Sequence, residues 1–575
     1  MNRSRMTISC VIIILMGCTL IIWNGYHYWS MLYTSIDDKQ IIKKLQNTRY
    51  DFIIVGGGTA GSIIIRKIWD GFQKHRCCSL HKNNLCLSQM TCMRRVVYSN
   101  NNNLICQAIC FDYQPKILLL ESGPRISWSM KKISDIPLFA PLLYGRGIDE
   151  IDRTTSQRSA AFQMKDNVIL IPRGHVLGGT ALLNAMIFSY DFFTTLFGDR
   201  TEGCQLKPEM VSHLPYNELI HSYFSEAFNL QGQKVNSVPT YESVEGLNTP
   251  MVFVRNAQRI SSYSECLLPL MNKNLEDLTV ITDIHVEKCD VSVIDCSIFF
   301  PGILSQASAL TSIGYYRTSY QKAENDSRPD IQYTIISASP FEKDTFESLG
   351  NFNPTAWHQF SKDENRANFE NPIVLLVSLL NPLSRGEIKM KKNDNGSPNG
   401  KLEVNPAYLS EPNDVNRLVE GIIWIYKALN YVNAMNKLNL TISNTKKPIS
   451  IKLHLPHYFG CPKIPKAESE KSFEQTNFSE ELKEAIACLT KSTTLSNYHT
   501  VGTCAMKLQN TNYPAVVDQN FKLIGVNNVR IGDASVISKI PTGNPAALIM
   551  AIGNQLAKYV VRENWQQLIM TTNSK

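Results

Sequence analysis

Residues 50–61 read YDFIIVGGGTAG, and this stretch decides the fold class of the chain. The run YDFIIV has the composition of a parallel strand that is buried on both faces. It leads into a G-x-G-x-x-G turn, in which Gly56 permits the tight turn, Gly58 lets the backbone approach a pyrophosphate, and Gly61 lets the next helix pack on the strand. The N-terminus of that helix is suited to bind phosphates. The residues expected to contact a dinucleotide here are Gly56, Gly58, Thr59, Ala60 and Gly61.

A second buried strand is expected at residues 116–120, and it ends in Glu121. A carboxylate at this position hydrogen-bonds the adenosine ribose in dinucleotide-binding domains. In a compact unit the acidic residue follows the glycines after about 20 residues, whereas here roughly sixty intervene. The excess, residues 70–114, is polar and rich in Cys and Asn. We expect it to be an insertion that loops out from the sheet, although a mistaken exon boundary would give the same pattern.

The composition is that of an ordinary globular protein and argues against several classes of function. The 575 residues are 43% hydrophobic and 19% charged, with a formal net charge of +8. The basic residues are scattered rather than gathered in a stripe, so no nucleic-acid partner is expected. The 15 cysteines follow no zinc spacing, and their disulfide connectivity cannot be deduced from the sequence. His454 and His457 lack a third ligand nearby, so no metal site is expected.

The N-terminus has the order of charges and apolar residues that is typical of a signal peptide. Arg3 and Arg5 precede an apolar run at residues 10–23, and residues 1–30 are expected to be a signal peptide of a secreted protein. The alternative is an uncleaved segment that anchors the protein to a membrane, because aromatic residues follow the run and no cleavage site stands out. Four N-x-S/T sequons agree with a secretory route; they are Asn325, Asn395, Asn439 and Asn477.

Residues 172–184, PRGHVLGGTALLN, contain two closely spaced glycine groups and a terminal Asn. This stretch resembles the first signature of the glucose-methanol-choline (GMC) oxidoreductases, and the closest likeness is to insect glucose-dehydrogenase-like members. The resemblance implies that FAD is the cofactor and that this loop lies along the flavin. His175, Thr180 and Ala181 depart from the usual residues of the signature. The residues that it assigns to the cofactor are Arg173, Val176, Gly178, Gly179 and Asn184.

The C-terminal stretch of the chain carries several motifs in a fixed order. YHTVGTCAM at 498–506 precedes VRIGDAS at 529–535, PTGNP at 541–545 and an apolar helix at 546–559. Order and spacing resemble the C-terminal block of the GMC family. By that resemblance His499 is the catalytic histidine and Asn544 the second catalytic position, while Asp533, followed by Ala534, is the strand-end residue that contacts the flavin's ribityl chain.

Each of these residue types suits the chemistry, and some have a simpler explanation. An imidazole is largely neutral at neutral pH, so His499 can accept the hydroxyl proton of an alcohol. The amide of Asn544 can hold the alcohol oxygen without competing for the proton. Asn544 also precedes an apolar helix and would serve as its N-cap. Cys504 is expected to be a small buried residue rather than a nucleophile, because hydride transfer needs no thiol.

The motifs at opposite ends of the chain predict an α/β fold in which a Rossmann-like FAD/NAD-binding domain is assembled from separated segments. Its parts are expected at 45–190, 281–318 and 486–575. A substrate-binding domain of mixed sheet plus helices is expected from a cap region at 191–280 and from 319–485, with a strand at Ile331–Ile336. Val286 is assigned by the resemblance to a strand at the adenine end of the cofactor, although a buried strand valine is an equal alternative.

Some stretches depart from the family pattern. Residues 301–314 are only a worn version of the second signature, and parts of the usual sequence are missing after Asn184 and after Gly314. The hypothesis is an FAD-dependent enzyme that oxidises a small-molecule alcohol and passes electrons to a quinone or oxygen. The alternatives are a catalytically impaired flavin-binding paralogue or an incomplete gene model. An NAD enzyme is also compatible with the glycine turn alone.

Overall fold

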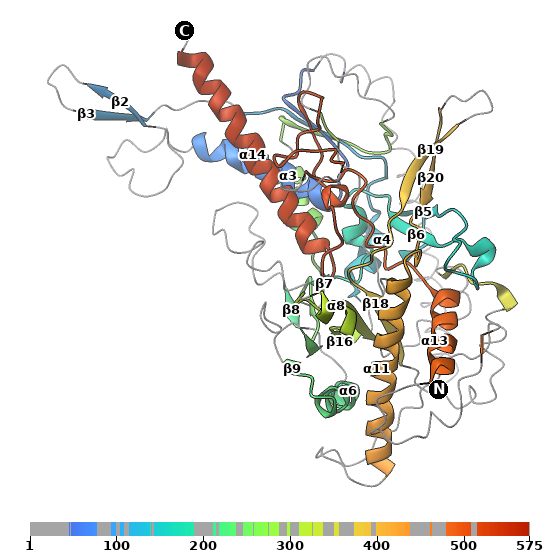
Figure 1. Ribbon diagram of the computed structural model, residues 1–575. Coiled ribbons are helices and arrows are strands. Elements are labelled where there is room, and N and C mark those ends of the chain that lie inside the picture. The colour runs from blue at the N-terminus through green and yellow to red at the C-terminus, as the bar shows by residue number, and fades with distance from the viewer. Residues whose placement is uncertain are drawn as a thin grey trace, which may run out of the picture. The chain divides into compact units, whose positions relative to one another are not determined.

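A computed structural model of the chain describes residues 45, 48–76, 94–98, 104–108, 114–137, 140, 143–188, 211–213, 218–236, 245–256, 258–273, 275–286, 296–298, 310–324, 326–336, 350–355, 373–392, 398–437, 461–462, 479–507 and 514–573. The chain divides into two compact units, Met1–Asp51 and Phe52–Lys575. Nearly all described residues belong to the second unit, whose fold follows (Figure 1). The N-terminal apolar run and the four sequons lie outside the described residues.

A parallel sheet of five strands draws its members from the whole length of the second unit. Across the sheet the strands are β14 (Leu278–Ile281), β4 (Ile117–Leu120), β1 (Phe52–Val55), β15 (Cys296–Ile298) and β21 (Val529–Arg530). Every neighbouring pair is parallel. The strand expected before the glycine turn and the strand expected before Glu121 are therefore both formed, and they are adjacent in the sheet. The domain is assembled from separated segments, as the sequence predicts.

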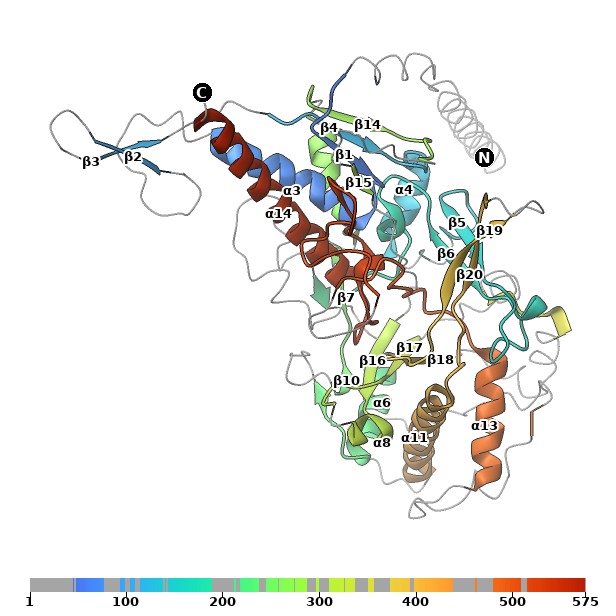
Figure 2. The same ribbon diagram turned by 45° about the horizontal axis from the view of Figure 1, so that its top comes forward.

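Two helices from distant parts of the chain pack against each other beside this sheet. Helix α3 (Thr59–Arg76) follows the glycine turn, and α14 (Ala546–Asn573) is the last element of the chain. A Cβ atom at Gly553 of α14 would lie 3.1 Å from the carbonyl oxygen of Ala60. The small residues let the two helix backbones come close, which places α14 along α3 (Figures 1 and 2).

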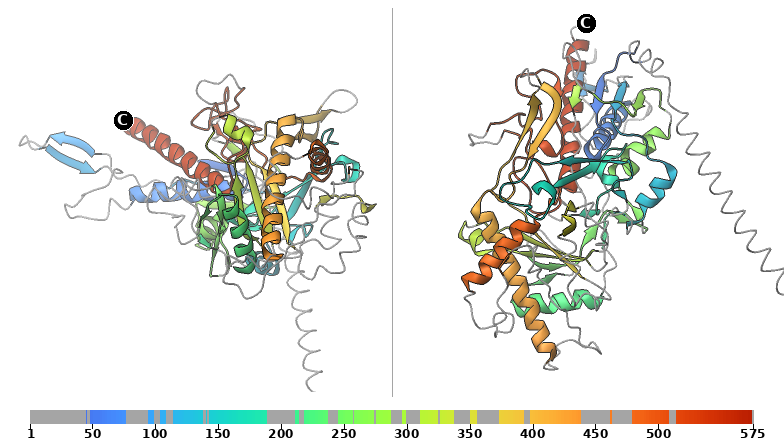
Figure 3. Two further views of the ribbon diagram at one scale, coloured as in Figure 1. Left: turned by 60° about the horizontal axis from the view of Figure 1, so that its bottom comes forward. Right: turned by 90° about the vertical axis from the view of Figure 1, so that its right-hand side faces the viewer.

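A second sheet of five strands is mixed and lies apart from the first in the topology. Its order is β18 (Val374–Leu379), β17 (Ile331–Ile336), β16 (Leu310–Tyr316), β10 (Gly246–Asn248) and β9 (Val235–Asn236). All pairs are antiparallel except β10 with β9. Helices α6 (Glu218–Leu230) and α11 (Pro412–Lys437) pack on it and on each other (Figure 3). Trp424 of α11 stacks on Tyr316 and Tyr333 of the sheet. The mixed sheet with helices agrees with the expected substrate-binding domain.

The remaining elements are short helices and small sheets. The helices are α4 (Trp128–Asp135), α7 (Leu268–Met271), α8 (Ser319–Ala323) and α13 (Glu480–Thr493). The other strands are β5 (Asp149–Arg153) with β6 (Leu170–Gly174), β7 (Ile187–Phe188) with β11 (Met251–Val252) and β8 (Ser212–His213), β12 (Val254–Arg255) with β13 (Gln258–Arg259), and β19 (Glu387–Lys392) with β20 (Pro398–Asn405). Among the described residues no helix is both long and apolar enough to cross a membrane.

The insertion begins later than the sequence indicates. Helix α3 continues to Arg76, Asp70 forms an ion pair with Arg66, and Phe72 is buried in the core. The expected start of the insertion at Asp70 is therefore wrong, because this last part of α3 belongs to the folded domain. Beyond it, strands β2 (Arg94–Tyr98) and β3 (Leu104–Ala108) form a two-stranded sheet of their own rather than joining the parallel sheet.

Three sequence assignments near the expected middle segment of the cofactor domain differ from the structure. Strand Leu278–Ile281 belongs to the parallel sheet, so this part of the domain begins before residue 281. Strand Leu310–Tyr316 pairs in the second sheet, so the end of the worn second signature is not a cofactor loop. Val286 lies in the loop after β14 and is only half-buried, so its assignment to a strand is wrong. The short apolar runs did not reveal which sheet each would join.

Candidate active site

The glycine turn has the geometry that its glycines predict. Gly56 adopts a φ of +97°, which L residues with a side chain rarely adopt, and its N–H donates to the carbonyl oxygen of Leu120 at 2.7 Å. A Cβ atom at Gly61 would lie 2.0 Å from the carbonyl oxygen of Gly56. The reasons given for Gly56 and Gly61 in the turn are therefore confirmed. Contact of Gly58, Thr59 and Ala60 with a cofactor stays a prediction.

The carboxylate of Glu121 fastens this turn from the neighbouring strand. It accepts hydrogen bonds from the N–H of Gly57 at 2.7 Å and from the N–H of Gly123 at 2.8 Å. Burial raises the pKa of Glu121, while these two N–H donors act in the opposite direction. Each carboxylate oxygen has a second lone pair. Glu121 therefore holds the loop and keeps lone pairs for a further donor, and its contact with a ribose hydroxyl stays a prediction.

The second glycine loop lies directly on the first. The N–H of Gly178 donates to the carbonyl oxygen of Gly57 at 3.0 Å. A Cβ atom at Gly179 would lie 2.8 Å from the Cα atom of Gly58. Gly178 and Gly179 both have positive φ, of +111° and +60°. The sequence separates these loops by more than a hundred residues, and the fold brings them together only because each contact lacks a side chain.

Asn184 and Val176 are buried parts of this second loop. Val176 belongs to the apolar core around the parallel sheet. The Oδ1 atom of Asn184 accepts from the N–H of Met186 at 3.1 Å and from Nη1 of Arg259 at 2.7 Å. Asn184 thus shapes the end of the loop. Its contact with a flavin remains a prediction.

Arg259 is a structural residue of the site that the sequence did not reveal. Its guanidinium donates to the carbonyl oxygens of Ser134, Ala181 and Asn184 at 2.8, 3.2 and 2.6 Å. Its side chain is almost fully buried, and burial lowers the pKa of the guanidinium to about 10. Arg259 is therefore still a cation at neutral pH, and it ties α4 to the loop that ends at Asn184. A lone Arg in the sequence gives no signal of such a role.

Arg173 is placed differently from the other residues of its motif. It lies on β6 and forms ion pairs with Asp152 at 2.6 Å and with Glu150 at 3.2 Å on the neighbouring strand β5. These carboxylates engage the guanidinium on the hairpin. Its guanidinium is thus engaged on the hairpin rather than at the two glycine loops, and its role toward a cofactor stays a prediction.

His499 and Asn544 come together as the resemblance implies. Nε2 of His499 lies 3.3 Å from Nδ2 of Asn544, and Nδ1 lies 3.5 Å from Nδ2 of Asn497. A neutral imidazole has one acceptor nitrogen, so only one of the two amides can donate to it. With Asn544 as that donor, Nε2 is the unprotonated nitrogen and Nδ1 carries the proton. Both catalytic candidates are buried.

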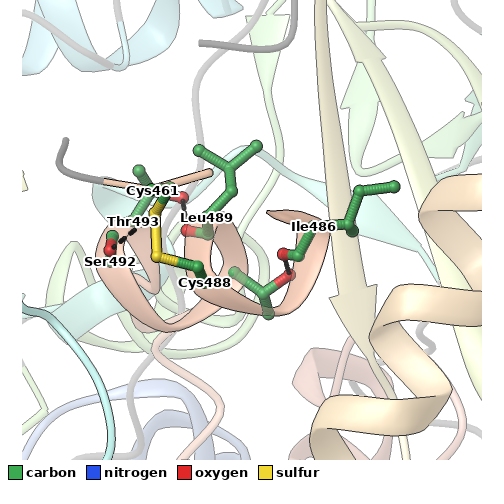
Figure 4. Close-up of a disulfide and its surroundings, with 7 residues drawn as sticks. Cys461, Ile486, Cys488, Leu489, Ser492 and Thr493 are labelled. Carbon is green, nitrogen blue, oxygen red and sulfur yellow. Dashed lines mark hydrogen bonds between the residues drawn. A yellow bond between two sulfur atoms is a disulfide. The ribbon is translucent and has the colours of Figure 1, made fainter. Parts of the chain in front are cut away.

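The chain before His499 is held in an unusual conformation. Tyr498 has a φ of +58°, which is uncommon for a residue with a side chain. Its N–H donates to Oγ of Ser496 at 2.9 Å, and the hydroxyl of Tyr408 donates to the same oxygen at 2.8 Å. The preceding helix, α13, is tied by a disulfide between Cys488 and Cys461 (Figure 4). These contacts fix the direction from which His499 enters the site.

The end of strand β21 supports the same region. Oδ1 of Asp533 accepts from the N–H of Ser535 at 2.9 Å, and the N–H of Cys504 donates to the carbonyl oxygen of Ser535 at 3.0 Å. Asp533 and Ala534 are buried. Cys504 is half-buried rather than fully buried as expected; it has no disulfide, and burial raises the pKa of its thiol. The block at 498–506 therefore lies beside the block at 529–535.

The electrostatics of His499 suit a proton acceptor. Burial lowers the pKa of His499 to about 4. The ring is therefore neutral at physiological pH, which is the state that can take a proton from a hydroxyl. No group of three or more potential metal ligands occurs among the described residues, and His454 and His457 lie outside them.

The residues present fit a dinucleotide that extends from the glycine turn to His499. Asn544 lies just before α14, and Gly553 of that helix touches Ala60 at the start of α3. The seven steps along the helix from Ala546 to Gly553 span about 10 Å, at 1.5 Å per residue. The hydroxyl of Thr542, on the same loop as Asn544, is buried without a hydrogen-bond partner in the described part of the chain. A ligand bound beside this loop would supply a partner for it.

The match to known proteins is strongest in the C-terminal half. Residues 382–553 match the family model of the GMC oxidoreductases. Dehydrogenase pkfF of Emericella nidulans is 26% identical over 263 residues, which cover 45% of this chain and 36% of that protein. The glucose dehydrogenase [FAD, quinone] of Drosophila melanogaster is 23% identical over 305 residues, which cover 52% of this chain and 41% of that protein. The chain thus spans well under half the length of these curated relatives.

Solved structures of flavoenzymes share the fold. A variant of the formate oxidase of Aspergillus oryzae RIB40, whose FAD modification was examined, has a TM-score of 0.58 at 14% identity and covers 90% of this chain and 99% of that one. At this identity the similarity is one of fold alone. The chain is thus related to the GMC oxidoreductases, and this family and its structural neighbours are FAD-dependent.

Proposed function

We propose that this relative of the GMC oxidoreductases is an FAD-dependent enzyme that oxidises the CH–OH group of a small-molecule alcohol. The observation that carries the proposal is the buried pair of His499 and Asn544, with Nε2 and Nδ2 3.3 Å apart. Asn544 lies just before α14, the helix that packs against the start of α3. A neutral acceptor beside an amide donor is the arrangement that removal of a hydroxyl proton requires.

Each residue of the pair has a separate task. Nε2 of His499 takes the proton of the alcohol hydroxyl, and burial keeps the ring in its neutral form at neutral pH. When an alcohol binds, the amide of Asn544 donates to the alcohol oxygen instead of to Nε2, and this frees the single lone pair of Nε2 for the hydroxyl proton. FAD, when bound, accepts the hydride, so that two electrons and one proton leave the carbon and one proton leaves the oxygen. Burial of both side chains keeps water away from the reacting atoms.

The glycine loops serve the cofactor in this proposal. Gly56, Gly58 and the start of α3 bind the pyrophosphate, because backbone N–H groups at a helix N-terminus attract anions. Glu121 accepts a ribose hydroxyl, and Asp533 lies at the strand end where it can reach the ribityl chain. The loop with Gly178 and Gly179 covers the glycine turn and closes this side of the site.

A finer likeness to insect glucose dehydrogenase is part of the proposal. The support is the Drosophila melanogaster relative, at 23% identity over 305 residues. Electrons then pass to an acceptor such as a quinone or oxygen. The protein enters the secretory route and is secreted, or else stays anchored by its N-terminal segment; the apolar run at 10–23 and the disulfide between Cys461 and Cys488 support this route.

The experiment that tests the function uses the purified full chain. A yellow protein whose absorbance persists through gel filtration, and which releases FAD on denaturation, carries the expected cofactor. Anaerobic mixing with sugars, choline, benzyl alcohol and aliphatic alcohols then follows bleaching of the flavin band. Bleaching by at least one alcohol is the expected result. A yellow protein that no member of the panel bleaches favours the catalytically impaired relative, and a colourless but folded protein overturns the proposal.

A further inference from the structure

Two turns of the chain meet next to His499, and both hold residues in an uncommon backbone conformation. In the turn after β20, Ala407 and Leu409 have positive φ, of +51° and +54°. In the turn before His499, Tyr498 has a φ of +58°. Such conformations cost free energy in residues that carry a side chain, and they cluster at functional sites, where the surrounding structure imposes them. The contact between these two turns is therefore a candidate for a role in the reaction.

A hydrogen bond between two hydroxyl groups joins the turns. Tyr408 lies between the two residues of positive φ in the first turn, and its phenol donates to Oγ of Ser496 at 2.8 Å. The same oxygen accepts from the N–H of Tyr498 at 2.9 Å. A hydroxyl oxygen has two lone pairs with which to accept. Both are used here, so the two donors together fix the place of the Ser496 oxygen.

The turn that presents Tyr408 is itself held by hydrogen bonds. The N–H of Tyr408 donates to Oε1 of Gln157 at 3.0 Å, and Nε2 of Gln157 donates to the carbonyl oxygen of Thr155 at 2.9 Å. Oδ1 of Asn405 accepts from the N–H of Ala407 at 3.1 Å. Gln157 is 2% exposed, so water competes little for its hydrogen bonds. Burial of the phenol raises the pKa of Tyr408, which therefore keeps its proton as a donor.

We propose that Tyr408 is a positioning residue for the reaction, and that through Ser496 it sets the place of His499 relative to Asn544. This role rests on the proposed function, because it serves the same proton transfer. Tyr408 acts without touching the substrate, since Ser496 lies three residues before His499 in the chain. Without the phenol hydroxyl, Oγ of Ser496 loses one of its two donors. The turn then relaxes toward negative φ at Tyr498, and the imidazole moves with it.

The size of the expected effect follows from the geometry that proton transfer requires. Nε2 of His499 and Nδ2 of Asn544 lie 3.3 Å apart, and an alcohol oxygen has to reach both at hydrogen-bond distance. A general base works within about 2.6–3.2 Å of the oxygen whose proton it takes. A misplacement of about 1 Å, caused by a change away from the reacting atoms, can cost ~10²-fold in rate. A small movement of the turn before His499 is therefore enough to slow the reaction.

The test removes one oxygen atom from each of two tyrosines. Tyr408→Phe deletes the hydroxyl that bonds Ser496. Tyr223→Phe is the matched control, because Tyr223 is a buried residue of α6 whose hydroxyl donates to the carbonyl oxygen of Leu429 in α11. Anaerobic bleaching of the flavin by one alcohol gives the rate constant at saturation and the half-saturating concentration. Thermal unfolding of both variants is measured alongside.

We expect the rate constant of Tyr408→Phe to fall at least about tenfold, while the half-saturating concentration changes by less than about twofold. The rate constant of Tyr223→Phe should equal that of wild type. A role in packing alone would lower the unfolding temperature of both variants and leave both rate constants unchanged. A wild-type rate constant in Tyr408→Phe would therefore overturn the proposal.

Ser496→Ala shows whether the effect passes through Ser496. Two residues that act through one contact have non-additive effects. The double variant Tyr408→Phe/Ser496→Ala should therefore be no slower than the slower single variant. Multiplied effects would show that Tyr408 acts by another route, and this outcome also contradicts the proposal. If Tyr408→Phe does not fold, Ser496→Ala removes the same hydrogen bond and is compared with Tyr223→Phe in its place.

Hydrogen exchange separates a failure of this role from a failure of the proposed function. If no alcohol bleaches the wild-type flavin, amide exchange of residues 494–502 is compared between the two tyrosine variants of the full chain. Faster exchange in Tyr408→Phe than in Tyr223→Phe would keep Tyr408 as the residue that places His499, although the proposed reaction has failed. Equal exchange in the two variants would overturn the positioning role as well.

Discussion

Nε2 of His499 lies 3.3 Å from Nδ2 of Asn544, although 45 residues of chain separate the two. The packing of α14 on α3 is what brings Asn544 into place, since the residue lies just before α14. The pair is therefore set by a helix contact that lies beside the glycine turn. Because the two side chains are in contact, a charge introduced at position 544 should act directly on the pKa of His499.

Asn544→Asp should move the pH dependence of flavin reduction upward. A carboxylate beside the ring favours the imidazolium form, so the pKa of His499 rises and protonation removes the acceptor at a higher pH, by about one pH unit or more. The measurement is the reduction rate constant between pH 4 and 8 with one alcohol at saturation. Asn544→Ala is the matched variant, because it removes the amide without adding charge. An equal shift in both variants would show that the carboxylate does not act on His499.

The burial of His499 should make folding stability depend on pH. The unfolded pKa is about 6.5, whereas the folded value is about 4. Below pH 6.5 the unfolded chain takes up a proton that the folded chain refuses, so stability present above pH 6.5 is lost as the pH falls toward 4. The loss amounts to at most about 3 kcal/mol.

Urea unfolding of wild type and His499→Gln measures this loss directly. Glutamine is uncharged over the whole range, so the difference in unfolding free energy between the two proteins should fall from pH 7 to pH 4. Comparison of the two cancels the contribution of other titrating groups. A difference that stays constant over this range would contradict the burial of a neutral His499.

Gly61→Ala should disrupt the glycine turn. Its Cβ would lie 2.0 Å from the carbonyl oxygen of Gly56, a backbone atom that cannot move aside without opening the turn. We expect a loss of stability of about 1–3 kcal/mol and weak flavin retention, measured by thermal unfolding and by the ratio of flavin to protein absorbance. Gly232→Ala is the control for flavin content, since an added Cβ there has no atom within 4 Å and the only strain comes from its φ of +69°. Full flavin content in Gly61→Ala would contradict the account of the turn.

Deletion of residues 77–113, with the ends joined by a short Gly/Ser linker, should leave flavin binding intact. Helix α3 ends at Arg76, and β2 and β3 pair with each other rather than with the parallel sheet. Loop closure depends only weakly on length, so the shorter connection is tolerated. The measurement is soluble yield and flavin content. A deletion that starts at Asp70 is the matched variant and should fail, because it removes Phe72 from the core. Equal failure of both would show that the insertion is part of the domain.

Much of the site was predictable because glycines with a required backbone geometry and short sequence motifs mark it. Gly56 and Gly61 are required by backbone geometry, which any sequence with this turn must satisfy. His499 and Asn544 came from the resemblance rather than from spacing, since no local pattern links residues 45 apart. The parallel strands around the turn were predictable as buried apolar runs.

The remainder depended on long-range contacts that no local pattern encodes. Strand Leu310–Tyr316 is buried along its whole length, and only its partners show that it joins the second sheet rather than the parallel one. Val286 follows its strand instead of lying in it. Arg259 acts through carbonyl oxygens of Ser134, Ala181 and Asn184, and backbone acceptors leave no trace in a sequence. Helix α3 continues past Asp70 because Phe72 packs in the core. The pattern of apolar residues in the sequence did not indicate this.

The most direct test of the account is the rate at which an alcohol bleaches the flavin of His499→Ala under anaerobic conditions. If His499 takes the hydroxyl proton, the variant keeps its yellow colour, because the glycine turn and Glu121 hold the cofactor, and reduction slows by ~10²–10⁴-fold, as is usual for a lost general base. Wild type, measured with the same alcohol, gives the reference rate. Equal bleaching rates in wild type and His499→Ala would contradict the account, because they would remove His499 from the mechanism.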